Sequence, residues 1–193
     1  MDRRLIILLV AALALAVVNA AAFAYYDVSL SLAPTAPPVY FAEGDNANEP
    51  DLGGGGTPYT SNVIEVAIGD ASTSLSITVH PTYRRVYYHN VSLIINQDGK
   101  AYNLWLRVET PLDEGKIQSA TLYVKDSSGT TQLTVNLKAT GTTGPAQIPA
   151  GGKWYVDVEI QIDATGGSYD TPPFASDSAS LELIYSPSSE SPP

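Results

Sequence analysis

The sequence predicts an all-β protein, a β-sandwich of jelly-roll type with one additional strand at its N-terminus. Three observations favour this fold. Apolar and polar residues alternate with a period of two over most of the chain. Glycine-containing turns, such as Asp98-Gly99 and Ser128-Gly129, separate these stretches. No helical periodicity follows residue 24. Many short strands with Gly-rich turns and no helices are typical of a sandwich.

Eight strands are predicted within a domain that spans residues 39–186. The stretch at 154–162 alternates most clearly, since Trp154 and Val156 point to one side and Tyr155 and Asp157 to the other. We expect a polar, Gly-rich loop at 43–61 and a disordered Ser/Pro-rich tail at 187–193. The predicted strands are 63–68, 74–80, 86–95, 102–110, 117–125, 131–138, 154–162 and 179–185.

The N-terminus has the layout of a secretory signal peptide. Arg3 and Arg4 precede an apolar run that ends in small residues, and Ala22 and Ala24 give an A-x-A cleavage pattern. We therefore predict cleavage after residue 24. The alternative is an uncleaved anchor, because about 20 apolar residues suffice to cross a bilayer. Both interpretations place the rest of the chain outside the cytoplasm, and the first leaves no stable membrane span.

Composition limits the classes of partner and chemistry. The 193-residue chain has 20 acidic and 10 basic side chains and a net charge of -10, which argues against binding to nucleic acid. It contains no cysteine, so disulfides, thiol catalysis and cysteine-bound metals are excluded. Stability must come from the core, from partners or from bound ions.

The stretch that follows the predicted cleavage site is a strand attached through a tether. In residues 25–32, the side chains of Tyr26, Val28, Leu30 and Leu32 share one face. Three prolines in residues 33–38 favour an extended spacer that cannot continue a β-ladder. The strand either returns to an edge of its own sandwich or pairs with a neighbouring copy. Pairing in trans joins different surfaces of each copy, and its default product is a filament.

This layout resembles that of the archaeal bundling-pilus subunits, which belong with the TasA and camelysin-like biofilm matrix proteins. The resemblance rests on the stretch "AAFAYYDVSLSL", the proline-bearing spacer, and a cysteine-free strand domain with "KWYVDVEIQI" near its end. It implies a jelly-roll subunit, exported by the general pathway, whose residues 25–32 complete a sheet of the next subunit. It also implies filaments that bundle into an extracellular matrix.

Three further sets of residues are candidate sites. Asp45, Asn48 and Asp51 crowd oxygen ligands into one loop, although without EF-hand spacing, so a solvated loop and a calcium site are both open. Arg84 and Arg85 form either a basic docking patch for another subunit or filament, or a hairpin turn whose charges protect a sheet edge. Asn90 begins the N-glycosylation sequon "NVS".

The sequence offers little support for an enzyme. Its two histidines, His80 and His89, do not form an H-E-x-x-H zinc motif. We expect the carboxylates Asp157, Glu159 and Asp163 to lie along one solvated strand face, where nothing orients them for glycoside hydrolysis. Trp105 and Trp154 are expected to pack in the core rather than to stack on sugars.

The sequence therefore predicts a secreted, non-enzymatic filament subunit without a cofactor. Its expected partners are identical subunits in the filament and neighbouring filaments in a bundle. The alternative is a monomeric, lectin-like binding module at the cell surface.

Overall fold

The computed structural model describes residues 2–8, 10, 35–49, 64–80, 84–166 and 176–193, in two units, Met1–Thr35 and Ala36–Pro193. In the first unit, residues 3–8 are helical. No helix within these described ranges has the length and apolar character needed to span a bilayer. Most of the predicted signal peptide and the whole predicted donor strand at 25–32 lie outside the described residues.

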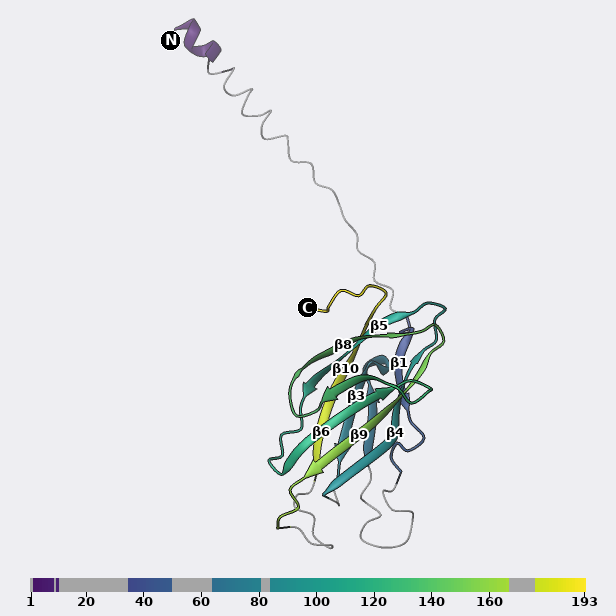
Figure 1. Cartoon of the computed structure of the whole chain (residues 1–193). Coiled ribbons are helices and arrows are strands. Elements are labelled where there is room, and N and C mark those ends of the chain that lie inside the picture. Colours follow the sequence, from purple (N-terminus) through teal and green to yellow (C-terminus); the bar gives the residue numbers. More distant parts are fainter. Residues whose placement is uncertain (1, 9, 11–34, 50–63, 81–83, 167–175) are drawn as a thin grey trace. The chain divides into compact units, whose positions relative to one another are not determined.

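The second unit is a sandwich of two antiparallel, five-stranded sheets, which confirms the predicted all-β class (Figure 1). The first sheet has the order β1-β4-β9-β6-β7, and the second β2-β3-β10-β5-β8. The strands are β1 (Val39–Glu43), β2 (Glu65–Gly69), β3 (Ser74–Val79), β4 (Arg85–Asn96), β5 (Tyr102–Thr110), β6 (Ile117–Lys125), β7 (Thr131–Asn136), β8 (Gly141–Ile148), β9 (Lys153–Ile162) and β10 (Asp177–Ser186).

The strand order is that of a jelly roll. Strands β3 to β6 pair with β10 to β7 in reverse order, which gives the neighbours β3/β10, β4/β9, β5/β8 and β6/β7. This is one long hairpin, folded over so that its pairs alternate between the two sheets. Strands β1 and β2 extend the sheets beside β4 and β3.

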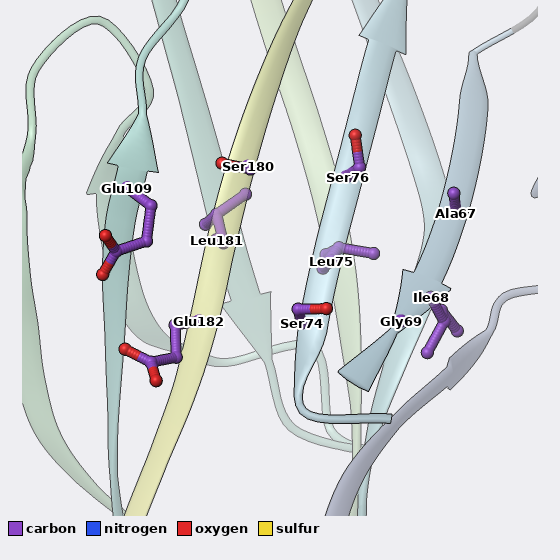
Figure 2. Close-up of a pocket in the computed structure, with 10 residues that line it drawn as sticks. All are labelled: Ala67, Ile68, Gly69, Ser74, Leu75, Ser76, Glu109, Ser180, Leu181 and Glu182. Atoms are coloured by element: carbon purple, nitrogen blue, oxygen red, sulfur yellow. The ribbon is translucent and has the colours of Figure 1, made fainter. Parts of the chain in front are cut away.

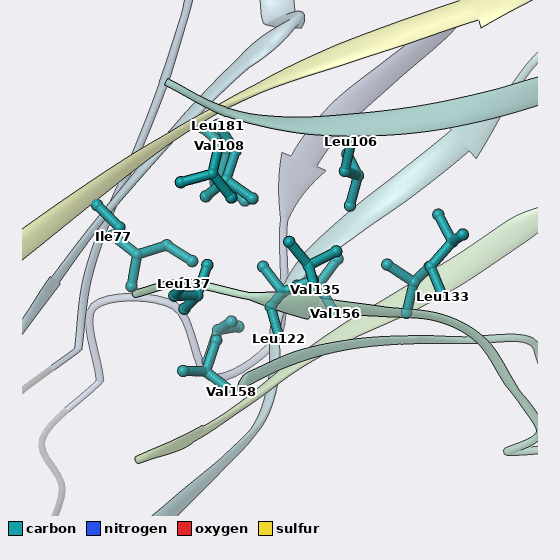
Figure 3. Packing of buried hydrophobic residues seen from close by; sticks show 14 of the residues in the cluster. Ile77, Leu106, Val108, Leu122, Leu133, Val135, Leu137, Val156, Val158 and Leu181 are labelled. Carbon is teal, nitrogen blue, oxygen red and sulfur yellow. The ribbon is translucent and has the colours of Figure 1, made fainter. Parts of the chain in front are cut away.

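The core lies between the sheets and is built by period-two alternation. On β9, the side chains of Val156, Val158 and Ile160 are at most 1% exposed. They face aliphatic residues of the other sheet, including Val108 and Leu181 (Figure 3). Because the stiff, branched side chains fill a pleated surface well, this alternation is enough to specify which face is buried.

The eight predicted strands are present, but the sequence interpretation missed β1 and β8. Strand β1 has only five residues and directly follows Pro37 and Pro38, the end of the proline-rich stretch at 33–38 that predicts a tether. Strand β8 contains Gly141, Gly144 and Pro145, residues that normally argue against a strand. These residues are tolerated because β8 is an edge strand with a bulge opposite Trp105. The register of its pairing with β5 shifts there, between Leu104 and Leu106.

Both tryptophans are buried, as predicted, but on different sides of their sheets. Trp154 is 3% exposed and belongs to the cluster between the sheets. Trp105 is 2% exposed and lies against the β8 bulge, where a Cβ at Gly144 would be 2.7 Å from Trp105 Cδ1. Neither indole is therefore available as a platform for a sugar ring.

Candidate functional site

A bulge in β4 shapes the outer face of the first sheet. The pairing of β4 with β9 shifts register between Tyr88 and Ser92, and Asn90 has a left-handed φ of 51°. The loop after β1 covers this bulge: Gly44 N donates to Val91 O and Asn46 N donates to Asn90 O, both at 3.2 Å. The extra residue re-aims the side chains around it, which is the usual effect of a bulge.

Asp157 of β9 lies under this bulge and is fully buried. Its Oδ1 accepts a 2.8 Å hydrogen bond from Asn90 N and lies 2.9 Å from His89 Nδ1. Its Oδ2 accepts a 2.6 Å bond from Tyr87 OH and lies 2.9 Å from Lys125 Nζ. Both carboxylate oxygens are thus satisfied by two partners each, as a buried charge requires.

The electrostatics favour the ionised form of Asp157. Burial acts to raise its pKa, but the hydrogen bonds from Asn90 N, Tyr87, Lys125 and His89 outweigh burial and hold the pKa below its usual range. Hydrogen bonds to Tyr87 and Asp157 raise the pKa of Lys125 to about 12. Burial and the hydrogen bond to Asp157 raise the pKa of Tyr87. Lysine and aspartate therefore form a stable ion pair.

This charge state also bears on covalent chemistry between Lys125 and Asp157. Condensation to an amide requires a neutral amine as the nucleophile and a protonated carboxyl as the electrophile. The raised pKa of Lys125 and the lowered pKa of Asp157 oppose both requirements. The 2.9 Å separation of Lys125 Nζ and Asp157 Oδ2 is that of a structural ion pair.

Tyrosine rings cover the ion pair and form a polar, aromatic surface, which we call the tyrosine face (Tyr87, Tyr123, Lys125 and Tyr155). The rings of Tyr87 and Tyr123 are stacked with centroids 6.4 Å apart. Lys125 Nζ lies 5.3 Å and 5.9 Å from their centroids. Tyr87 is 45% exposed, which makes it the one large hydrophobic side chain with high exposure among the described residues of the sandwich.

The prediction for Asp157 was wrong, because this carboxylate is neither solvated nor free of orienting partners. Glu159, two residues along the same face, keeps some exposure and accepts hydrogen bonds from Arg85 Nε at 2.6 Å and Tyr123 OH at 3.1 Å. Asp163 follows β9 and accepts from Thr165. Alternation correctly assigns Asp157 to the outer side of the strand, but only the bulge of β4 makes that position a buried one.

One of the two arginines of the candidate basic patch is already paired within its own chain, and docking to another subunit stays a prediction. Arg84 and Arg85 are exposed, but Arg85 forms an ion pair with Glu159 of its own chain. Arg84 contributes its backbone oxygen, which accepts from Ile162 N. Arg85 lies in the part of β4 beyond the residues that β1 covers. The two histidines have different carboxylate partners, since His80 contacts Glu65 at 3.0 Å and His89 contacts Asp157 at 2.9 Å.

The candidate calcium ligands have structural partners. Asn48 Oδ1 accepts from Val66 N at 2.8 Å, and Asn48 Nδ2 donates to Val66 O at 3.2 Å, so this side chain pairs with β2 as a backbone would. Asp45 Oδ2 accepts from Asn90 Nδ2 at 3.0 Å. Asp51 lies outside the described residues. Within the described ranges, no three acidic, histidine or cysteine side chains are grouped as metal ligands.

The sequon asparagine is enclosed by the same structure. Asn90 is 5% exposed, and its Nδ2, the atom that N-glycosylation would modify, donates to Asp45. Glycan attachment in the folded state requires the loop after β1 to move away from the bulge. Glycosylation of Asn90 stays a prediction, and it would have to precede the folding of this region.

The second sheet carries a cavity of about 520 Å³ over β2, β3, β5 and β10 (Figure 2). Its lining includes the small side chains of Ala67, Ser76 and Ser180 and the carboxylates of Glu109 and Glu182. Arg107 lies 3.9 Å from the first carboxylate and 3.6 Å from the second. The side chains of Glu109 and Glu182 are about half exposed, at 53% and 47%.

Comparisons with known proteins add no functional information. No protein-family model matches the chain, and no curated protein matches it. Among solved structures, it is similar to an arabinose-bound α-L-arabinofuranosidase with 11% identity and a TM-score of 0.29, covering 76% of this chain and 26% of that one. A structure of the Gt strain of infectious bursal disease virus has 16% identity and a TM-score of 0.23, covering 69% and 36%. The chain thus spans a minor part of both.

Proposed function

We propose that this protein is a secreted structural subunit that polymerises into extracellular filaments by donating residues 25–32 to a sheet of a neighbouring copy. The observation that carries the proposal is the boundary of the sandwich. A compact unit begins at Ala36, and its first strand starts at Val39 directly after the proline-rich tether. Along the sequence, the alternating segment at 25–32 therefore precedes a sandwich that has its own core.

The energetics are adequate for a non-covalent joint. Burying Tyr26, Val28, Leu30 and Leu32 at about 1.5–3 kcal/mol each gives roughly 6–12 kcal/mol before ordering costs. Backbone hydrogen bonds to an edge strand add to this. Because donor and acceptor are different surfaces, each subunit has one of each, and assembly continues head to tail. Lateral contacts between such filaments would then form the bundles of an extracellular matrix.

Replacing Leu30 with Asp should abolish filaments while leaving the sandwich folded. The substitution places a charge among the inserted side chains, where desolvation opposes strand insertion. Ser29→Asp is the matched control, since Ser29 lies on the opposite face of the strand and its charge would stay in water. Electron microscopy of the secreted fraction provides the measurement. Normal filaments from the Leu30→Asp variant, or from a chain that lacks residues 25–32, would contradict the proposal.

The tyrosine face supports a second candidate function, a lectin-like module. Tyr87 is 45% exposed beside Tyr123, and paired aromatic rings on a sheet are suited to stacking on sugars. On this alternative, Tyr87→Ala should lose binding to a glycan array by at least tenfold, whereas Tyr87→Phe should keep the ring and most of the binding. Wild-type protein that binds no glycan on the array would remove this candidate.

A further inference from the structure

From the edges of the two sheets we infer that β1 is the strand that accepts the donor segment of a second copy. This inference rests on the proposed function and names the part of the neighbouring subunit that takes up residues 25–32. Among the described strands, the edge strands are β1 and β7 in the first sheet and β2 and β8 in the second.

Strands β7 and β8 are poor acceptors. They contact each other at one side of the sandwich and are joined by the short connection 137–140. Strand β8 contains Pro145, which has no backbone N–H, and Gly144, whose bulge packs against Trp105. An added strand would meet an interrupted ladder on β8.

Strand β2 is already occupied at the start of its outer edge. Asn48 N donates to Ile64 O at 3.2 Å, and the Asn48 side chain bonds both Val66 N and Val66 O. Ile64 O and both backbone groups of Val66 are thereby satisfied within the chain. A donor strand would have to displace these bonds before it could pair with β2.

Strand β1 has a row of backbone groups directed to its open side. Gln97 N donates to Pro38 O at 2.9 Å and Gly44 N donates to Val91 O at 3.2 Å, which fixes the phase of its ladder with β4. Since bonded pairs alternate in an antiparallel ladder, the backbone groups of Val39, Phe41 and Glu43 point away from β4. Within the described residues, no strand pairs with β1 on that side.

A cavity at the start of β1 provides room for a large side chain. It measures about 320 Å³ and lies between the first residues of β1 and the short 3-10 segment η2 (Asp70–Ser72). Its lining residues are Ala36, Pro37, Tyr40, Ala71, Ser72 and Gln97. A tyrosine or leucine of the donor strand would bury apolar area against this largely uncharged lining.

The η2 segment that lines this cavity holds a strained backbone. Ala71 has a φ of 55° and Ser72 a φ of 66°, and neither is a glycine. Two successive left-handed residues that are not glycine are uncommon, and strained backbones of this kind are concentrated at binding sites and switches. The strained η2 segment, the cavity and the unpaired side of β1 are thus next to one another. Strand β1 also contacts β2, the edge strand of the other sheet, so these two strands border one side of the sandwich, where the sheets are open to each other. A strand added here would cover that opening.

Disulfide cross-linking tests this inference, because the natural chain has no cysteine. We combine Ser29→Cys in the donor strand with one cysteine on the outward face of each edge strand. The acceptor positions are Ala42 on β1, Ala67 on β2, Thr134 on β7 and Gln147 on β8, and Ser31→Cys replaces Ser29→Cys in a second set to allow for register. Mild oxidation of assembled protein is followed by non-reducing gel electrophoresis.

The expected result is a ladder of covalent oligomers in the Ala42→Cys set, at least fivefold more intense than in the other three. A ladder that appears instead with Ala67→Cys, Thr134→Cys or Gln147→Cys would overturn the choice of β1 and keep the proposed function. Filaments in the microscope without a ladder in any set would also overturn it. A fast-migrating, internally bonded monomer without filaments would contradict donor-strand exchange itself.

Discussion

Asp157→Ala should lower the free energy of unfolding by about 3–5 kcal/mol, the loss expected when one member of a buried ion pair is removed. The substitution leaves Lys125, the Tyr87 hydroxyl and Asn90 N without the carboxylate that accepts from them. It also releases the β4 bulge, whose geometry Asp157 holds through the backbone of Asn90. Urea unfolding, monitored by tryptophan fluorescence, measures the change.

The matched control is Glu159→Ala, two residues away on the same face of β9. Glu159 pairs with Arg85, whose side chain is 72% exposed, and surface ion pairs contribute about 1 kcal/mol or less. A loss for Asp157→Ala that is no larger than the loss for Glu159→Ala would show that the burial of Asp157 carries no special weight.

Asp157→Ala should also change how the free energy of unfolding depends on pH. The pKa of Asp157 is lower in the folded than in the unfolded chain, so the folded state binds fewer protons below about pH 5. Its contribution to stability is complete above the unfolded pKa of about 3.9 and is lost as the pH falls toward the folded value. We expect the stability of Asp157→Ala to fall less steeply below about pH 5 than that of the wild type, as measured by urea unfolding at a series of pH values.

Gly44→Ala should destabilise the protein by about 3 kcal/mol, at the upper end of the range for overpacking. A Cβ at Gly44 would lie 2.0 Å from Asn90 O, 2.6 Å from Asn90 C and 2.7 Å from Ser92 N. All three are backbone atoms of the β4 bulge, which cannot rotate out of the way. The end of β1 would have to separate from β4, with loss of the bond from Gly44 N to Val91 O.

Thermal unfolding of Gly44→Ala should be compared with that of Gly115→Ala. Gly115 has no atom within 4 Å of its hypothetical Cβ, and its φ lies outside the left-handed region. The control should therefore be neutral or slightly stabilising, through the reduced entropy of the unfolded chain. Equal melting temperatures for the two variants would contradict the close approach of β1 to the bulge.

Much of the fold is determined by the sequence, because alternation specifies both the strands and their buried faces. In β9, Trp154, Val156 and Val158 are buried where the period of two places them. The glycine turns divide the chain into strands of the correct length. The short β1 and the Gly- and Pro-containing β8 carry no such signal, since pairing with β4 and β5 rather than propensity makes them strands.

Only the tertiary structure decides what the outer faces and edges do. Asp157 has the sequence pattern of a solvated residue, and it is buried because a bulge 67 residues away brings Asn90 onto it. The capped edge of β2 likewise depends on Asn48 reaching Val66 across a loop, and the open edge of β1 depends on which strands of the described residues pair with it. Local alternation records which side of a strand a residue faces, whereas burial and free hydrogen-bonding groups depend on neighbours that are distant in the chain.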